Sequence, residues 1–205
     1  MSAPKTKVAI IFYSELGGVA DDVAEGVNSV EGVEGVLLQV AETLSPDILE
    51  KMHAPPKPWP EIPVIQPNEL AEYDGFLFGI PTRFGMMAAQ MKSLFDATGQ
   101  LWVKGSLVGK PAGVFVSVGT QGGGIETTAL TTVTQLTHHG MIFVPCGYSF
   151  GERMFDLSEM HAGTPYGPAT YAGAKGERQP SQFELDYCRH QGEYFAKVAK
   201  KISGK

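Results

Sequence analysis

Three times in this chain, an apolar run with β-strand character leads directly into a loop of Ser, Thr and Gly, and a helical segment follows. The runs and their loops occupy residues 8–18, 75–85 and 112–124. A strand that is apolar at every position is buried on both faces, as in a parallel sheet covered by helices. In such a sheet the small polar loops lie together at the carboxyl edge, where open α/β folds bind ligands. The repetition therefore predicts a shared binding edge.

Five apolar strands alternate with helices along the chain, which predicts an α/β fold with a doubly wound parallel sheet. Strands are expected at 8–13, 35–40, 75–80, 112–116 and 141–145, and the main helices at 19–27, 87–96, 126–138 and 181–200. The last helix opens on a capping box at 181–184. Gly140 is expected to end the helix before it in a left-handed conformation. Residues around 101–102 and the whole of 147–180 show no period and are expected to be irregular.

The composition narrows the classes of protein to which the chain can belong. Of 205 residues, 43% are apolar and 19% are charged, and the formal net charge of −6 comes without a basic patch. We therefore expect no nucleic-acid partner. No apolar stretch approaches the roughly 18 residues of a membrane span, and no signal-peptide core precedes the first strand. Cys146 and Cys188 lack metal-ligand spacing, so we expect two buried thiols, no metal site and a cytoplasmic location.

The first loop joins a strand to a helix N-terminus, where backbone N–H groups and the helix dipole can hold an anion. Ser14 adds a hydroxyl, and Gly17 and Gly18 permit a tight backbone path. The loop has neither the Walker nor the Gly-x-Gly-x-x-Gly pattern, and it contains no Lys or Arg. These features favour a single phosphate held by neutral donors, and a plain strand–helix turn is the alternative.

The second and third loops bring a cation and many glycines to the same edge. Arg83 can neutralise an anionic ligand or simply pair with an acid at the surface. The third loop contains Ser117, Thr120 and four glycines. Glycine lets a flat ligand lie against the main chain, whose N–H groups can then bind the heteroatoms of a ring edge.

Two histidines and a tryptophan are further candidates for the site. His138 and His139 are adjacent on a predicted helix, so they point in different directions and make no metal pair. Each also suits the last helical turn because of the helix dipole. Trp102 can form the wall of a cleft, or it can fill the core or an interface.

Five motifs, at residues 79–85, 96–102, 138–141, 163–167 and 178–182, carry a resemblance to a known family. Together they make residues 7–200 resemble the WrbA-type NAD(P)H:quinone oxidoreductases, and more narrowly the fungal benzoquinone reductases among them. The resemblance implies a single flavodoxin-like FMN-binding domain over residues 1–205. Its five-stranded parallel sheet would have the strand order 2-1-3-4-5, with helices on both faces.

The resemblance also implies bound FMN, NADH or NADPH as co-substrate, a quinone as substrate, and a homotetramer whose sites are completed by neighbouring subunits. His138 would border the site as a candidate proton donor, and Trp102 and Phe84 would contact the quinone. Family members commonly carry Tyr-Gly-His at 16–18, so an aromatic beside the nicotinamide is lost at Leu16. The cofactor contacts implied by motif position are Ser14, Glu15, Leu16, Gly17, Gly18 and Val19 at the phosphate, Pro81, Thr82, Arg83 and Phe84 at the ring and ribityl chain, and Ser117, Val118, Gly119, Thr120, Gln121 and Gly122 at the ring edge.

Two-electron quinone reduction is the leading function, in which a hydride from NAD(P)H passes through the flavin to a quinone. The alternative is a one-electron carrier of the flavodoxin type, and a regulatory partner of a transcription factor is a third class. A carrier benefits from a strong acidic field around its flavin, whereas the charge here is mild. Anaerobic photoreduction separates the first two, because only the carrier is expected to accumulate semiquinone.

The segment 147–180 independently predicts a homo-oligomer. It contains large apolar residues that one small domain would struggle to bury, and contact with neighbouring subunits would cover them. These residues are Phe150, Met154, Phe155, Tyr166 and Tyr171.

Overall fold

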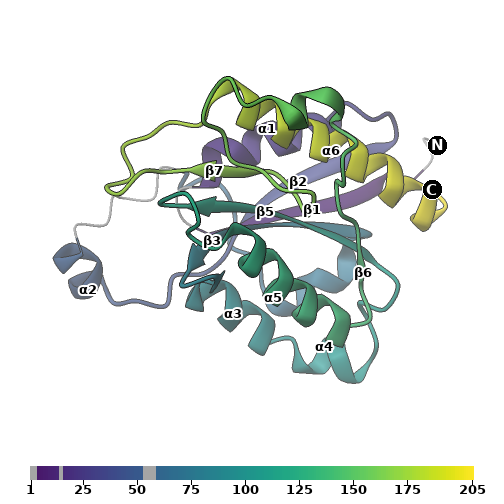
Figure 1. The fold of residues 1–205 in the computed structure, drawn as a ribbon. Helices are drawn as coiled ribbons and strands as arrows, with labels where there is room; N and C mark the ends of the chain where they lie inside the picture. The colour runs from purple at the N-terminus through teal and green to yellow at the C-terminus, as the bar shows by residue number, and fades with distance from the viewer. Residues whose placement is uncertain (1–3, 14–15, 53–58) are drawn as a thin grey trace.

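A computed structural model describes residues 4–13, 16–52 and 59–205. Its centre is a parallel sheet in which the strands lie in the order β2-β1-β3-β5-β6 (Figure 1). These strands are β1 (Thr6–Phe12), β2 (Val33–Gln39), β3 (Gly75–Arg83), β5 (Pro111–Val118) and β6 (Ile142–Phe143). With the short strands β4 and β7 set aside, this is the order 2-1-3-4-5, so the predicted strand order is confirmed, whereas the sheet has seven strands and not five.

Two separate strands share the fifth position of the sheet. β6 pairs with the start of β5, whereas β7 (Ala169–Tyr171) pairs with residues 116–118 at its end. Between them the chain leaves the sheet and forms a 3₁₀ helix, η3 (Gly151–Phe155). The prediction that 147–180 is irregular is therefore wrong at β7, because three residues are too few to show a strand period. A further short strand, β4 (Met86–Met87), pairs antiparallel with the end of β3.

Helices cover both faces of the sheet, as predicted (Figure 1). The helices α1 (Gly17–Asn28) and α6 (Gln182–Ser203) lie on one face, and α3 (Ala89–Asp96), α4 (Gly99–Val103) and α5 (Ile125–His138) lie on the other. The connection from β2 to β3 contains α2 (Pro46–Lys51) and the 3₁₀ helix η2 (Pro67–Glu72). The irregular stretch expected around 101–102 is α4, whose five residues are too short for a readable period.

Local sequence determines where α5 ends and α6 begins. The Ser181 hydroxyl accepts the Glu184 N–H at 3.3 Å, and the Glu184 carboxylate accepts the Ser181 N–H at 2.9 Å. This confirms the predicted capping box. Gly140, just beyond α5, has a φ of 69°, which is the left-handed conformation expected of it.

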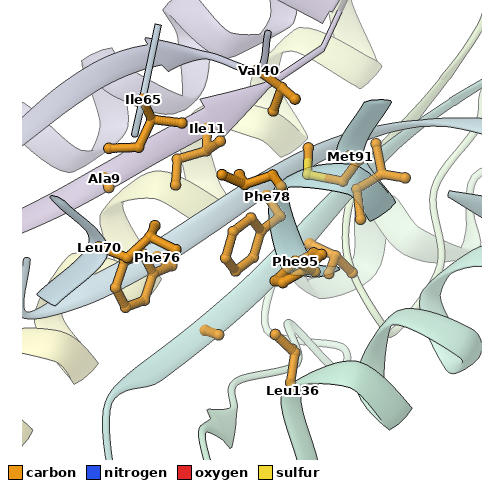
Figure 2. Close-up of a cluster of buried hydrophobic side chains, with 14 of the residues drawn as sticks. Ala9, Ile11, Val40, Ile65, Leu70, Phe76, Phe78, Met91, Phe95 and Leu136 are labelled. Carbon is orange, nitrogen blue, oxygen red and sulfur yellow. The ribbon is translucent and has the colours of Figure 1, made fainter. Parts of the chain in front are cut away.

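The strand β1 shows why the central strands are apolar at every position. Val8, Ile10 and Phe12 pack in the cluster beneath α1 and α6, whereas Ala9 and Ile11 belong to the cluster on the opposite face. Figure 2 shows that second cluster, where β3 meets α3 and α5. Each fully buried large aliphatic side chain contributes about 1.5–3 kcal/mol, so both faces of the sheet stabilise the fold.

The helices α1 and α6 approach each other through glycine. A Cβ atom on Gly26 of α1 would lie 2.0 Å from the Arg189 carbonyl oxygen. One on Gly192 of α6 would lie 2.1 Å from the Val23 carbonyl oxygen. Neither position has room for a side chain, and the two helices are therefore in backbone contact.

Most of the apolar residues expected to need a partner are covered within the chain. Phe150, Met154, Tyr166 and Tyr171 are partly buried against internal clusters, and only Phe155 is exposed, at 69%. Because the chain folds back on itself there, four of these five residues need no neighbouring subunit to cover them. Other large apolar side chains are exposed instead: Phe84, Met86, Trp102, Val103, Val108, Leu130, Tyr148, Leu157 and Met160.

Both cysteines are free and buried, as predicted. Burial raises the pKa of the Cys146 thiol to about 12, so it stays protonated and unreactive at neutral pH. Within the described ranges, no helix combines the length and the apolarity that crossing a membrane requires.

Candidate functional site

The first loop leads from β1 into α1. Ser14 and Glu15, which were expected to contact a phosphate, lie outside the described residues. Leu16 is the N-cap residue of α1 and its side chain makes no capping hydrogen bond, and the first turn of this helix contains no acidic residue. A Cβ atom on Gly18 would meet open space. The first turn of α1 therefore presents main-chain N–H groups beside a free volume, which is the arrangement that binds anions.

Leu16 does not present its side chain to that volume. The side chain is 1% exposed and packs in the cluster beneath α1 and α6. This corrects the expectation that residue 16 faces the nicotinamide. The hydrophobic effect favours burying a leucine by about 1.5–3 kcal/mol, so the core takes this side chain and leaves only its main chain at the loop.

The second loop exposes Arg83 at the end of β3. Its Nη1 donates to the Thr82 carbonyl oxygen at 2.9 Å. No carboxylate in the described part of the chain forms an ion pair with it, so the surface-pair alternative finds no partner there. Phe84 has a φ of 54° and a fully exposed side chain. Such a conformation costs a non-glycine residue roughly 1–2 kcal/mol, and it points the phenyl ring away from the molecule.

Glycine lets the second and third loops touch. A Cβ atom on Gly124 would lie 2.7 Å from the Gly85 Cα atom, and both residues have positive φ values of 103° and 76°. The Thr82 and Thr128 hydroxyls form a hydrogen bond of 2.5 Å between the end of β3 and the first turns of α5. The position of Arg83 is therefore set by the third loop as well as by β3.

Two adjoining cavities open at the carboxyl edge of the sheet. The Arg83 cavity, of about 330 Å³, and the Gly18 cavity, of about 320 Å³, share Ser117, Ala172 and Gly176, so they form one cleft. The cleft brings together the predicted residues Gly18, Val19, Pro81, Thr82, Arg83, Ser117, Val118 and Gly119. The predicted residues Phe84, Thr120, Gln121 and Gly122 line neither cavity.

The remaining lining consists of Trp59, at the Gly18 cavity, and of a wall formed by residues within 170–180, and the sequence assigned neither to the site. The wall is held by Glu184, which is fully buried. Its carboxylate accepts hydrogen bonds from the Ala162 N–H at 2.8 Å, the Thr170 hydroxyl at 3.0 Å, Arg178 Nη1 at 2.8 Å and the Ser181 N–H at 2.9 Å. A buried carboxylate is tolerated only with such partners. Glu184 therefore ties the wall to α6.

The described lining of the cleft contains cations and no carboxylate. Its charged residues are Arg83, Lys175 and Arg178. Arg178 is neutralised by its ion pair with Glu184. Arg83 and Lys175 have no such pair among the described residues, so the cleft favours an anionic ligand.

The structure separates His138 and Trp102 from this cleft. They line a different pocket, of about 180 Å³, between α4 and the end of α5. The helix α5 starts beside the third loop and runs for 14 residues, so His138 lies about 20 Å from that loop at 1.5 Å per residue. Within one chain, the expectation that both residues border the flavin site is therefore not met.

His139 connects the two helices of that pocket. It is 5% exposed, and its Nε2 lies 2.8 Å from the Thr98 hydroxyl oxygen. The Thr98 hydroxyl donates to the Phe95 carbonyl oxygen at 2.5 Å, so the His139 Nε2–H is the donor in the first bond. Burial lowers the pKa of His139, and the neighbouring His138 lowers it further. A neutral His139 therefore fixes the end of α5 to the start of α4, which carries Trp102.

Comparisons with known proteins agree with this arrangement. A model of the family described as NADPH-dependent FMN reductase matches residues 13–155. The chain is 58% identical over 200 residues to quinone-oxidoreductase QR2 of Triphysaria versicolor, covering 96% of this chain and 97% of that protein. It is 52% identical over 203 residues to an NAD(P)H dehydrogenase (quinone) of Geobacter sulfurreducens, covering 96% and 99%. A WrbA-like flavodoxin structure from Agrobacterium tumefaciens has a TM-score of 0.66 at 21% identity, covers 97% and 99%, and shows the fold.

Proposed function

The chain belongs to the NADPH-dependent FMN reductase family, and on this premise we propose that it reduces quinones to hydroquinones with NAD(P)H through a bound FMN. The observation that carries the proposal is the cleft, which joins the N-terminus of α1 to Arg83, an arginine without an ion pair among the described residues, along the carboxyl edge of the sheet. The relatives named quinone oxidoreductase and NAD(P)H dehydrogenase (quinone) share more than half of their residues with this chain. These relatives favour a quinone reductase over a one-electron carrier of the flavodoxin type.

The residues of the cleft fit FMN. At the Gly18 cavity, the first turn of α1 supplies N–H groups, and the N-cap residue Leu16 makes no side-chain hydrogen bond that would compete for them, which suits one phosphate. At the Arg83 cavity, a Cβ atom on Gly119 would have only the Gly173 carbonyl oxygen near it, at 3.6 Å. The main chain at Gly119 is therefore open to a flat ring. We assign the phosphate to Gly18 and Val19, and the ring to Thr82, Arg83 and residues 117–119.

FMN, when bound, supplies the two-electron chemistry, taking a hydride equivalent from NAD(P)H and giving it to the quinone. Arg83 holds a fixed positive charge beside the ring, where it stabilises the negative charge that develops during reduction. The main-chain N–H groups of residues 117–119 are already oriented and need no rearrangement. Formation of the hydroquinone also consumes one proton, and His138 is our candidate donor.

We place His138 and Trp102 at the flavin of a neighbouring subunit in a homotetramer. The cleft of the same chain is too far from both residues. Trp102 also lies in an exposed apolar region with Val103 and Val108, which are 70% and 64% exposed. A neighbouring chain would cover this surface and bring the imidazole and indole to the quinone.

In-trans complementation tests this placement. Arg83→Ala and Trp102→Ala variants are purified separately, mixed, and allowed to exchange subunits. We expect the mixture to recover activity, because some sites then combine an intact Arg83 with an intact Trp102. If both variants are weakened and no mixing ratio restores activity, the two residues serve the same chain and the placement is wrong.

The activity itself is tested on the purified protein. We expect flavin absorbance, release of FMN rather than FAD on heating, and oxidation of NADH or NADPH that depends on benzoquinone. Recovery of FAD alone, or of no flavin after reconstitution with FMN, would contradict the cofactor assignment. FMN binding without quinone-dependent oxidation of either dinucleotide would contradict the enzyme assignment.

The narrower expectations from the sequence remain part of the proposal. We place the protein among the benzoquinone reductases of fungal type, as one FMN-binding domain over residues 1–205. We also propose a cytoplasmic location, which two buried free thiols support because oxidising compartments favour disulfides.

A further inference from the structure

The turn after β7 carries a lysine at the Arg83 cavity. Gly173 and Gly176 have φ values of 83° and 74°, which favour glycine. The Gly176 N–H donates to the Gly173 carbonyl oxygen at 3.2 Å, and the Arg178 N–H donates to the Ala172 carbonyl oxygen at 2.8 Å. Lys175 therefore lies in a turn that is closed by its own hydrogen bonds.

Glu177 stabilises the turn without neutralising the lysine. Its carboxylate accepts the Lys175 N–H at 2.7 Å. A Cβ atom on Gly173 would lie 2.8 Å from that carboxyl group, so the carboxylate sits against the main chain. The Lys175 ammonium, by contrast, has neither a hydrogen bond nor an ion pair to any described residue. The turn is held in place, and its cation is left available for a ligand.

The position of Lys175 within the cleft indicates which ligand. It lines the Arg83 cavity together with Arg83, and it is not among the residues of the Gly18 cavity. The FMN phosphate is assigned to the Gly18 cavity, so Lys175 is placed for a second anion that arrives beside the ring. The co-substrate NAD(P)H carries such charge on its pyrophosphate, and NADPH carries more on its 2′-phosphate.

We propose that Lys175, together with Arg83, binds the phosphate groups of the incoming NAD(P)H and sets the enzyme's affinity for this co-substrate. This inference rests on the proposed function. In this role Lys175 contacts the phosphate groups of the dinucleotide and takes no part in the transfer of the hydride. Its contribution is therefore expected in the binding step and absent from the later transfer to quinone.

A charge reversal with a matched control tests the proposal on the FMN-loaded protein. The variant is Lys175→Glu, and the control is Lys201→Glu, which makes the same change at an exposed position near the end of α6. Three quantities are measured for both: KM and kcat for NADH and NADPH with benzoquinone, the dissociation constant of ADP by calorimetry, and the dissociation constant of FMN. ADP serves as a probe that carries the pyrophosphate but cannot be oxidised.

We expect Lys175→Glu to raise KM for the dinucleotide about five- to tenfold, equivalent to roughly 1 kcal/mol of binding. The ADP dissociation constant should rise with it, while kcat and FMN affinity match the control. A rise for NADH and NADPH alike assigns the lysine to the pyrophosphate, and a rise for NADPH alone assigns it to the 2′-phosphate. Raising the salt concentration should shrink the difference between variant and control.

Equal KM values and equal ADP affinities in the two variants would overturn the proposal, as would an absence of ADP binding to the wild type. Failure of the proposed function has a different signature. In that case the wild type oxidises neither dinucleotide, yet ADP still binds and Lys175→Glu still weakens it. The protein would then have a phosphate-binding subsite at Lys175 but no quinone reductase activity.

Discussion

Arg83 is a cation at the end of β3, and the one hydrogen bond of its side chain to a described residue is to the carbonyl oxygen of Thr82. Replacing it with alanine should weaken FMN binding about three- to tenfold, where tenfold corresponds to 1.4 kcal/mol. It should also lower the flavin's reduction potential, because the reduced ring loses its nearest fixed positive charge. Fluorescence titration and anaerobic redox titration measure the two effects. Arg83→Lys, which keeps the charge, should retain most of the wild-type reduction potential. If Arg83→Ala has the FMN affinity and reduction potential of the wild type, Arg83 is not part of the site.

His139 makes the stability of the fold depend on pH. Its pKa is lowered from the ordinary value of 6.5, chiefly by burial. As the pH falls below about 6.5, His139 binds a proton in the unfolded chain but remains neutral in the folded chain. The stability is therefore complete above the unfolded pKa and is lost as the pH falls toward the folded pKa.

Urea unfolding between about pH 8 and pH 5 measures this loss. The variant His139→Gln should show a shallower fall in the free energy of unfolding than the wild type. The free energy of unfolding of the variant should still decrease somewhat at low pH, because burial also lowers the pKa of His190. Identical pH profiles for the variant and the wild type would show that His139 is not the group responsible.

At the scale of elements, Glu184 joins α6 to the wall of the cleft. In Glu184→Gln one oxygen becomes a donor that faces other donors, and Arg178 loses its counter-ion. We expect a loss of about 2–4 kcal/mol in the free energy of unfolding, together with weaker FMN binding. Glu193→Gln on the same helix removes only an exposed pair with Lys197 and should cost less than about 0.5 kcal/mol. Comparable losses in the two variants would contradict this role.

The elements that the sequence predicted are those long enough to show a pattern, either an unbroken apolar run or a helical period. The central strands and the four main helices follow from such patterns, and so does their order once the resemblance is included. β7 and α4 were missed because three and five residues are too few to show a period. The wall of the cleft was missed for another reason. Glu184 is visible in the sequence as a capping residue, but its bonds to Ala162 and Thr170 depend on a fold-back that no local pattern encodes.

The residues of the candidate site also fall into those that the sequence could place and those that it could not. Residues directly after a predicted strand, such as Thr82 and Ser117, are brought to one edge by the sheet alone. Leu16 was assigned to the ligand by motif position, yet its burial is decided by the packing of α1 against the sheet. Trp102 and His138 cannot be placed by the topology of a single chain.

At the scale of the whole molecule, we expect a homotetramer. The exposed apolar side chains of α4 and its surroundings support this, since Trp102 and Val103 are 61% and 70% exposed. Sedimentation at micromolar protein concentration should give a mass four times that of the chain. Trp102→Glu should shift the distribution toward smaller species without loss of secondary structure. A monomer that retains FMN and full activity would contradict the expectation.

The backbone contact between α1 and α6 has a consequence for how the protein is made. α6 covers the face on which Val8, Ile10 and Phe12 lie, and it is the last of the described elements to leave the ribosome. Until α6 packs against the sheet, α1 alone covers this face, and the apolar side chains that belong beneath α6 are exposed to solvent. A nascent chain in this state invites capture by holdase chaperones or association with other unfinished chains. Packing of α6 onto the sheet thus removes the exposed apolar surface that would otherwise favour such association.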